Sequence, residues 1–127
     1  MFIPADFDQQ VSLVEIDSHE QLRALLGGSA ERAVYDRDAE VWVNGTGLSD
    51  GLAHNLGASA YVAISSGAAR QRGGAIDVDL HGDVIMTGPD ETDVPERLIK
   101  EFAVTERHTV DELLGRDRRK GFGPEPR

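Results

Sequence analysis

Cysteine is absent from this chain of 127 residues. The absence excludes a disulfide scaffold, a cysteine zinc site and a thiol nucleophile, and it is typical of cytosolic proteins. The N-terminal stretch MFIPADFDQQ has no basic segment followed by an apolar core, so it does not resemble a signal peptide. No apolar run approaches the roughly 20 residues of a membrane helix. We therefore predict a cytoplasmic protein of one domain without a membrane anchor.

Positive charge is also scarce: 13 Lys and Arg residues stand against 23 Asp and Glu residues, for a net charge of −10. Residues 116–127 hold five basic and two acidic residues, so this tail carries +3 and the rest of the chain −13. An acidic body repels phosphate backbones, and we expect no direct binding of nucleic acid except through the basic tail. The acidic surface has two interpretations. It keeps the protein soluble, or it imitates DNA and engages a DNA-binding protein.

The first third of the sequence predicts strands and one well-bounded helix. Residues 2–4 and 11–16 are predicted to be strands, the latter because of its β-branched residues. Ser18 and Gln21 form a capping box for the following helix, which the Gly27-Gly28 pair would end.

Two short antiparallel strands are predicted next, with a turn at residues 36–38 between them. Residues 44–47, Asn-Gly-Thr-Gly, supply the conformations of a further tight turn. Trp42 lies between two valines and therefore points to the face opposite theirs. There it either packs on the sheet or forms the wall of a binding surface.

Residues 54–74 predict a second helix with Asn55 as its N-cap. Many of its residues are Gly, Ala or Ser, which favours close packing on a sheet. The alternative is a nucleotide phosphate at the helix N-terminus. The stretch GLAHNLGAS is neither a phosphate-binding loop nor a dinucleotide fingerprint, so this signal is weak.

Residues 75–87 alternate apolar and polar side chains and predict a strand, interrupted at Gly82 by a bulge or a turn. A third helix is predicted with Pro95 in its first turn and Asp93 or Val94 as its cap.

Thr109 and Glu112 form a capping box for a fourth helix, which Gly115 would end. Residues 116–127 are basic and rich in Gly and Pro, so we predict a disordered tail there. The predicted domain comprises residues 1–115.

No group of residues meets the requirements of a metal or catalytic site. The four histidines lack the i, i+4 spacing of a helical zinc site. Asp77, Asp79 and His81 share one face of the predicted strand and could bind a divalent cation, although a solvated face is more usual. His54, just before the cap of the second helix, is the best single catalytic candidate. We predict no metal, no cofactor and no enzymatic activity.

Three segments, SLVEIDSHEQLRALLGG, EVWVNGTGLSDGLAHNLGASA and GDVIMTGPDETDVP, cover roughly residues 11–95 in this order. Together they resemble a family of phage, plasmid and actinobacterial proteins, domain of unknown function 3846. Asn55, Ala58 and Ser59 match the family's middle motif, whereas Ala53 and His54 stand where that motif has prolines. The resemblance implies kinship of fold and a mobile-element setting. It implies no activity.

We predict an α+β domain with a mostly antiparallel sheet of about four to six strands, covered on one face by the first two helices. A ligand pocket is predicted between the start of the second helix and residues 82–88. Its candidate residues are Trp42, Asn44, His54, Asn55, Asp83 and Thr87.

The leading hypothesis is a non-enzymatic accessory protein of a phage or mobile element. It would contact a host protein, such as a DNA-binding or defence factor, through its acidic surface. The alternative is a protein that binds, sequesters or converts a nucleotide-like metabolite at the His54–Asn55 helix start.

Overall fold

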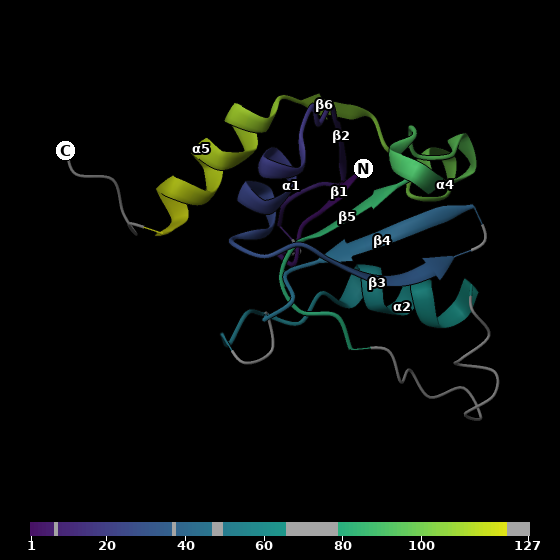
Figure 1. Ribbon diagram of the computed structural model, residues 1–127, viewed down its shortest axis with the longest axis horizontal. Coiled ribbons are helices and arrows are strands. Elements are labelled where there is room, and N and C mark those ends of the chain that lie inside the picture. The colour runs from purple at the N-terminus through teal and green to yellow at the C-terminus, as the bar shows by residue number, and fades with distance from the viewer. Residues whose placement is uncertain (7, 37, 47–49, 66–78, 122–127) are drawn as a thin grey trace.

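The structure of the protein, a computed structural model, describes residues 1–6, 8–36, 38–46, 50–65 and 79–121 (Figure 1). These residues form one α+β domain around a six-stranded sheet in the order β3-β4-β5-β1-β2-β6. The strands are β1 (Phe2–Ile3), β2 (Ser12–Val14), β3 (Glu31–Asp36), β4 (Ala39–Val43), β5 (Val84–Thr87) and β6 (Glu106–His108). Every neighbouring pair is antiparallel except β2 and β6, which are parallel. The predicted fold class is confirmed.

Helices cover both faces of this sheet. They are α1 (His19–Leu26), α2 (Leu56–Ser65), α4 (Glu96–Glu101) and α5 (Val110–Gly121), and η1 (Pro89–Glu91) is a single 3-10 turn. No helix within the described ranges combines the length and the apolarity needed to cross a membrane.

The prediction that the first two helices share one face of the sheet is wrong. The leucines of α1 pack with Phe2 and Ile85, whereas Ala58 and Val62 of α2 pack with Ile3 on the other side. In Figure 1, α2 lies below β3 and β4, and α1 lies to the left of the strands, next to α5. The physical reason is that β1 and β5 are apolar on both faces, so each face needs its own cover.

The hairpin of β3 and β4 is confirmed, with Asp36 paired with Ala39 next to the turn. Val41 and Val43 pack on the α2 side of the sheet, and Trp42 packs on the α1 side. The opposite orientation of Trp42, inferred from its place between two valines, is therefore correct.

Both predicted capping boxes are present. The Ser18 hydroxyl accepts a hydrogen bond from the Gln21 amide, and the Gln21 side chain accepts one from the amide of Asp17. Gly27 ends α1 in the left-handed conformation, with φ of 90°. At α5, Thr109 and Glu112 accept hydrogen bonds from each other's amides, whereas at α1 the Gln21 side chain reaches the amide before the cap residue.

Gly115 does not end α5, which continues to Gly121. A glycine ends a helix when its backbone becomes left-handed, and Gly115 is not among the residues with positive φ. The part of the predicted tail from residue 116 to residue 121 is therefore helical, and residues 122–127 lie outside the described residues.

The strand predicted at residues 75–87 is shorter in the structure, because β5 begins only at Val84. Residues 75–78 lie outside the described residues, and His81 forms a single bridge with His54. Gly82 then bends the chain with φ of 81°. The start of α4 is also shifted, since Pro95 is its cap in place of Asp93 or Val94.

Candidate functional site

Three strands end together at one end of the sheet. Because β1 is antiparallel to both β5 and β2, and β2 is parallel to β6, the carboxyl ends of β2, β5 and β6 coincide. The chain passes from β2 into α1 and from β6 into α5, so both helices begin at this end (Figure 1).

A group of hollows, which we call the acidic trough, lies at this end of the sheet. It consists of three adjoining hollows of about 270, 380 and 650 Å³, and Asp17 lines all of them. The half-buried apolar side chains along it are Leu13, Val14, Ile16, Val94 and Ile99. The trough therefore offers an apolar surface as well as charged groups.

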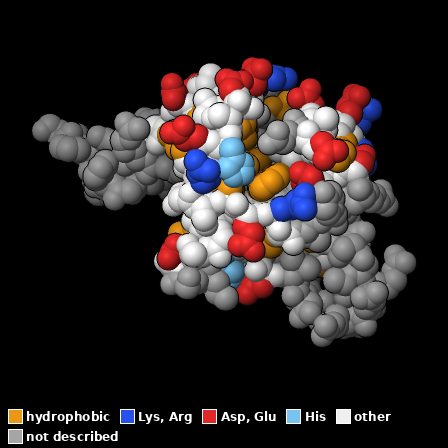
Figure 2. All heavy atoms as spheres, viewed as in Figure 1, with side chains coloured by type: hydrophobic (Ala, Val, Ile, Leu, Met, Phe, Trp, Pro, Cys, Tyr) orange, Lys and Arg blue, Asp and Glu red, His pale blue; other side chains and the backbone are white. Residues whose placement is uncertain are grey.

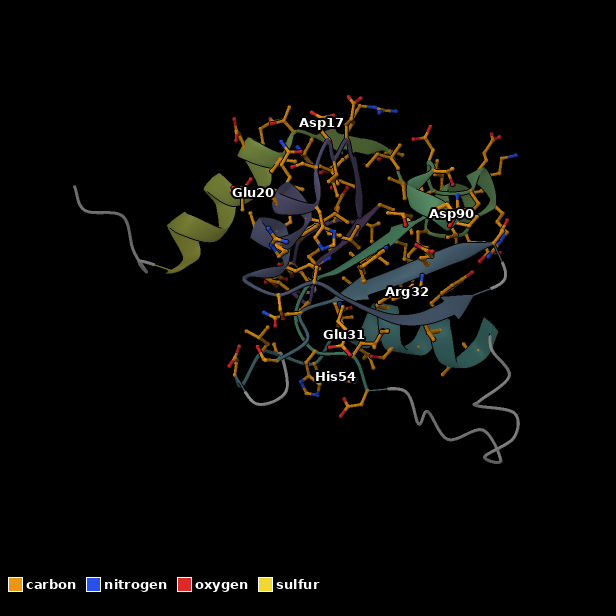
Figure 3. All side chains as sticks on the ribbon, in the orientation of Figure 1. Asp17, Glu20, Glu31, Arg32, His54 and Asp90 are labelled. Atoms are coloured by element: carbon orange, nitrogen blue, oxygen red, sulfur yellow. The ribbon has the colours of Figure 1, made fainter. Side chains whose placement is uncertain are left out.

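Carboxylates dominate the charge of the trough. Its acidic lining residues are Glu15, Asp17, Asp93, Glu96, Asp111 and Glu112, all exposed, and its cationic side chain is Arg107. Figure 2 shows red acidic side chains gathered over the upper part of the molecule, and Figure 3 places Asp17 at the top of it. The capping boxes already occupy amides at both helix starts, so the trough favours a cationic ligand over an anion.

Two predicted site residues lie at the narrow end of the trough. Trp42 donates a hydrogen bond from Nε1 to Thr87 Oγ1 at 3.1 Å. The ring of His19 meets the Trp42 ring edge-on, with centroids 6.0 Å apart. Trp42, Thr87 and His19 line the hollow of about 270 Å³. Trp42 is therefore a side wall of the trough.

Two other predicted residues, Asn44 and Asp83, line a separate hollow of about 590 Å³ at the opposite end of the sheet. Buried Asn44 donates from Nδ2 to the Leu26 carbonyl at 3.0 Å and accepts the Thr46 amide at 2.9 Å. Asp83 accepts the Ala5 amide at 3.0 Å. Both side chains thus hold backbone in place.

Asn55 is the predicted cap of α2 and performs that role, since its Oδ1 accepts the Ala58 amide at 3.1 Å. Its Nδ2 donates to the carbonyls of Ile3 at 2.9 Å and Gly82 at 3.0 Å. The residue is 1% exposed, and both amide hydrogens are used. Asn55 fastens α2 to β1 and to the segment before β5, with no donor left for a ligand.

His54 belongs to a third group, with Asp79 and His81. Its Nε2 lies 3.3 Å from Asp79 Oδ1, and His81 Nε2 lies 2.9 Å from the same oxygen. The two imidazole rings have centroids 5.5 Å apart. His81 Nδ1 contacts the Leu52 carbonyl at 2.8 Å. The Leu52 carbonyl and, after it, Asp79 raise the pKa of His81 above its usual value.

The six predicted site residues therefore occupy three places. Trp42 and Thr87 lie in the trough, and Asn44 and Asp83 line the hollow at the other end. His54 belongs to the histidine group, and the adjacent Asn55 caps α2. Sequence reasoning missed the carboxylates that give the trough its charge. The two capping boxes indicated where α1 and α5 begin, which is where several of these carboxylates lie. No local pattern, however, predicts that β2 and β6 pair in parallel and bring the two helix starts together.

The fold and the trough define an acidic α+β domain with a groove at the carboxyl ends of its strands. A family model described as a domain of unknown function, DUF3846, matches residues 1–107, and the chain belongs to this family. The match extends on both sides of the segments 11–95 that carry the resemblance in the sequence. No curated protein and no solved structure matches the chain.

Proposed function

We propose that this protein is a non-enzymatic binding protein whose acidic trough holds a basic segment of a partner protein. The observation that carries the proposal is the combination of six exposed carboxylates with half-buried apolar side chains in adjoining hollows that share Asp17. A surface that only kept the protein soluble would not need its charges gathered along an apolar groove.

The chemistry of the partner follows from the lining of the trough. Lysine or arginine side chains would face carboxylates such as Glu15 and Asp111, and apolar side chains would lie on Ile16 and Ile99. Charge complementarity of this kind guides encounter and selects partners, and the apolar contacts supply affinity. Proteins that bind DNA present lysine and arginine side chains to its phosphates.

We therefore propose as partner a protein with a basic, DNA-binding surface in the cytoplasm of a host cell. The protein would act as an accessory factor of a phage or other mobile element, the setting that the resemblance in its sequence implies. Its carboxylates would stand in for DNA phosphates in the contact.

The alternative function, a nucleotide-like ligand at the start of α2, has less support. A phosphate there would need free donors, and both amide hydrogens of Asn55 are bonded to backbone carbonyls. The adjacent His54 contacts a carboxylate, Asp79, which would repel a phosphate.

The proposal is tested with a fluorescently labelled peptide that alternates arginine and leucine. We expect its anisotropy to rise on binding at low ionic strength and the affinity to fall as salt screens the charges. A peptide with glycine in place of leucine should bind more weakly, because it cannot cover the apolar side chains. Trp42 is the only tryptophan, so a change in its emission would report binding at the trough.

Two matched double variants distinguish an effect of the trough carboxylates from an effect of the net charge of the protein. Glu15→Gln with Glu96→Gln removes two charges from the trough, and we expect binding of the arginine-leucine peptide to weaken roughly fivefold. Asp8→Asn with Glu31→Gln removes the same charge from exposed positions outside it, and we expect little change. Equal losses in both variants, or no binding at low salt, would refute the proposal.

A further inference from the structure

The histidine pair is held by the backbone as well as by its side chains. His54 and His81 are partners in an antiparallel bridge that joins the segment before α2 to the segment before β5. Cross-strand partners project their side chains from the same face at close range. Hydrogen bonds from the Asn55 amide to the Leu80 carbonyl and from the Gly82 amide to the Ala53 carbonyl, both 2.7 Å, fix this register.

The surroundings of His81 determine where its ring hydrogen lies. A carbonyl oxygen only accepts hydrogen bonds, so the Nδ1 atom 2.8 Å from the Leu52 carbonyl must carry the hydrogen. In the neutral imidazole, Nε2 then presents a lone pair. This Nε2 atom is buried and lies 2.9 Å from Asp79 Oδ1, without the alignment of a hydrogen bond.

A lone pair that faces a carboxylate oxygen at this distance is unfavourable unless a cation is shared between them. His54 Nε2 approaches the same oxygen at 3.3 Å, so two nitrogen bases and one carboxylate meet around one point. Either a proton or a metal ion satisfies this arrangement. A donated N–H from Nδ1 to a backbone carbonyl is also the usual support of a histidine that binds metal through Nε2.

We propose that His54 and His81 form a two-histidine chelate for a divalent transition-metal ion such as Zn²⁺ or Ni²⁺, with the Asp79 carboxylate as counter-charge. Imidazole nitrogens suit both ions, and water would complete the coordination. Bond lengths of about 2.1 Å require each nitrogen to move roughly 1 Å toward the ion. His54 and Asp79 are both well exposed, which leaves their side chains room for this movement.

The site is a pair rather than a preformed cage. As the side chains stand, the described residues contain no group of three or more His, Asp or Glu arranged to hold a metal ion. The carboxylate of Asp79 now lies where the ion would bind and has to turn aside. We therefore expect an affinity well below that of a structural zinc site.

A proton competes with the metal ion for His81. The charged and titratable groups described next to its ring are Asp79 and His54. Acid should therefore weaken metal binding, because an imidazole must lose its proton from the ligating nitrogen before it can bind the ion.

Calorimetric titration of the full chain with ZnCl₂ and NiCl₂ near neutral pH tests the proposal. We expect one ion per chain and loss of binding on acidification. His54→Gln should weaken binding at least tenfold, since even an outer-shell change commonly costs roughly that much. The exposed His54 carries the main test, because the His81 ring also contacts the Leu52 carbonyl and its replacement would remove that contact as well.

His108→Gln is the matched control, since His108 Nε2 also contacts a carboxylate, Glu106 Oε1, at 2.8 Å. We expect its metal binding to equal that of the unchanged protein. Nitrogen NMR shifts of both His54 and His81 on addition of Zn²⁺ should identify the ligands directly. No binding by the unchanged protein, or unchanged affinity after His54→Gln, would overturn the proposal.

Discussion

At the trough end of the sheet, Glu15 and Asp17 are exposed, whereas at the opposite end Asn44, Asn55 and Asp83 bond the backbone. Figure 3 shows the separation, with Asp17 at the top and His54 at the bottom. Both sets of residues lie where strands meet turns or helices. The difference teaches that a polar side chain between a strand and a turn or helix is available for binding only when the nearby backbone groups already have hydrogen-bond partners.

Asn55→Ala should have the largest effect on stability. It tests the end of the sheet at which polar side chains bond the backbone. The substitution leaves the buried carbonyls of Ile3 and Gly82 without their donor and removes the cap of α2. We expect a loss of about 2–4 kcal/mol in the free energy of unfolding, measured with urea. Glu15→Gln in the trough should change it by less than about 0.5 kcal/mol.

Asn55→Asp distinguishes the cap from the two donated bonds. Aspartate caps helices as well as asparagine does, so a role limited to capping predicts little change. The structure instead predicts a loss similar to that of alanine, because a carboxylate would face two carbonyl oxygens. A stable Asn55→Asp variant would show that the two ends of the sheet differ less than their contacts indicate.

The sequence predicted well those features that depend on neighbouring residues. The capping boxes of Ser18 and Thr109, the cap at Asn55 and the orientation of Trp42 all depend on spacings of a few residues, and all are present. The predicted end of α5 at Gly115 is wrong. That prediction used only the identity of the residue, whereas the backbone of Gly115 remains helical.

The trough and the histidine pair could not be predicted, because both depend on contacts distant in sequence. The trough exists because β6 pairs in parallel with β2, which brings Asp111 near Asp17. The pair exists because the segment before α2 bridges to the segment before β5, which brings His81 to His54. Local patterns carry no information on either pairing, whereas the apolar residues on both faces of β1 and β5 were a signal for helices on both sides.

Gly88→Ala should have the next largest effect and lies at the trough end, just after β5. A Cβ there would collide with the Asp93 carbonyl oxygen and the Thr92 hydroxyl. Because backbone cannot yield as a side chain can, we expect a loss of about 1–3 kcal/mol in urea unfolding. Gly115→Ala is the control, since a Cβ there meets nothing within 4 Å and alanine favours a helix by up to about 1 kcal/mol. Equal effects at both glycines would mean that the turn before α4 is looser than its contacts indicate.

His81→Gln should have the smallest effect, visible as a dependence on pH. The surroundings of His81 raise its pKa in the folded protein, so the imidazolium stabilises the fold. This stabilisation is fully present below the unfolded pKa of about 6.5 and is lost as pH rises through the higher folded pKa. The difference in unfolding free energy between the unchanged protein and His81→Gln should therefore be largest below about pH 6.5 and shrink as the pH rises above it. His108→Gln, measured over the same range, gives the background of a histidine at the other end of the sheet. A difference that grows with pH would show that His81 is neutral in the fold, and added Zn²⁺ should restore the lost stability at the upper end if the metal replaces the proton.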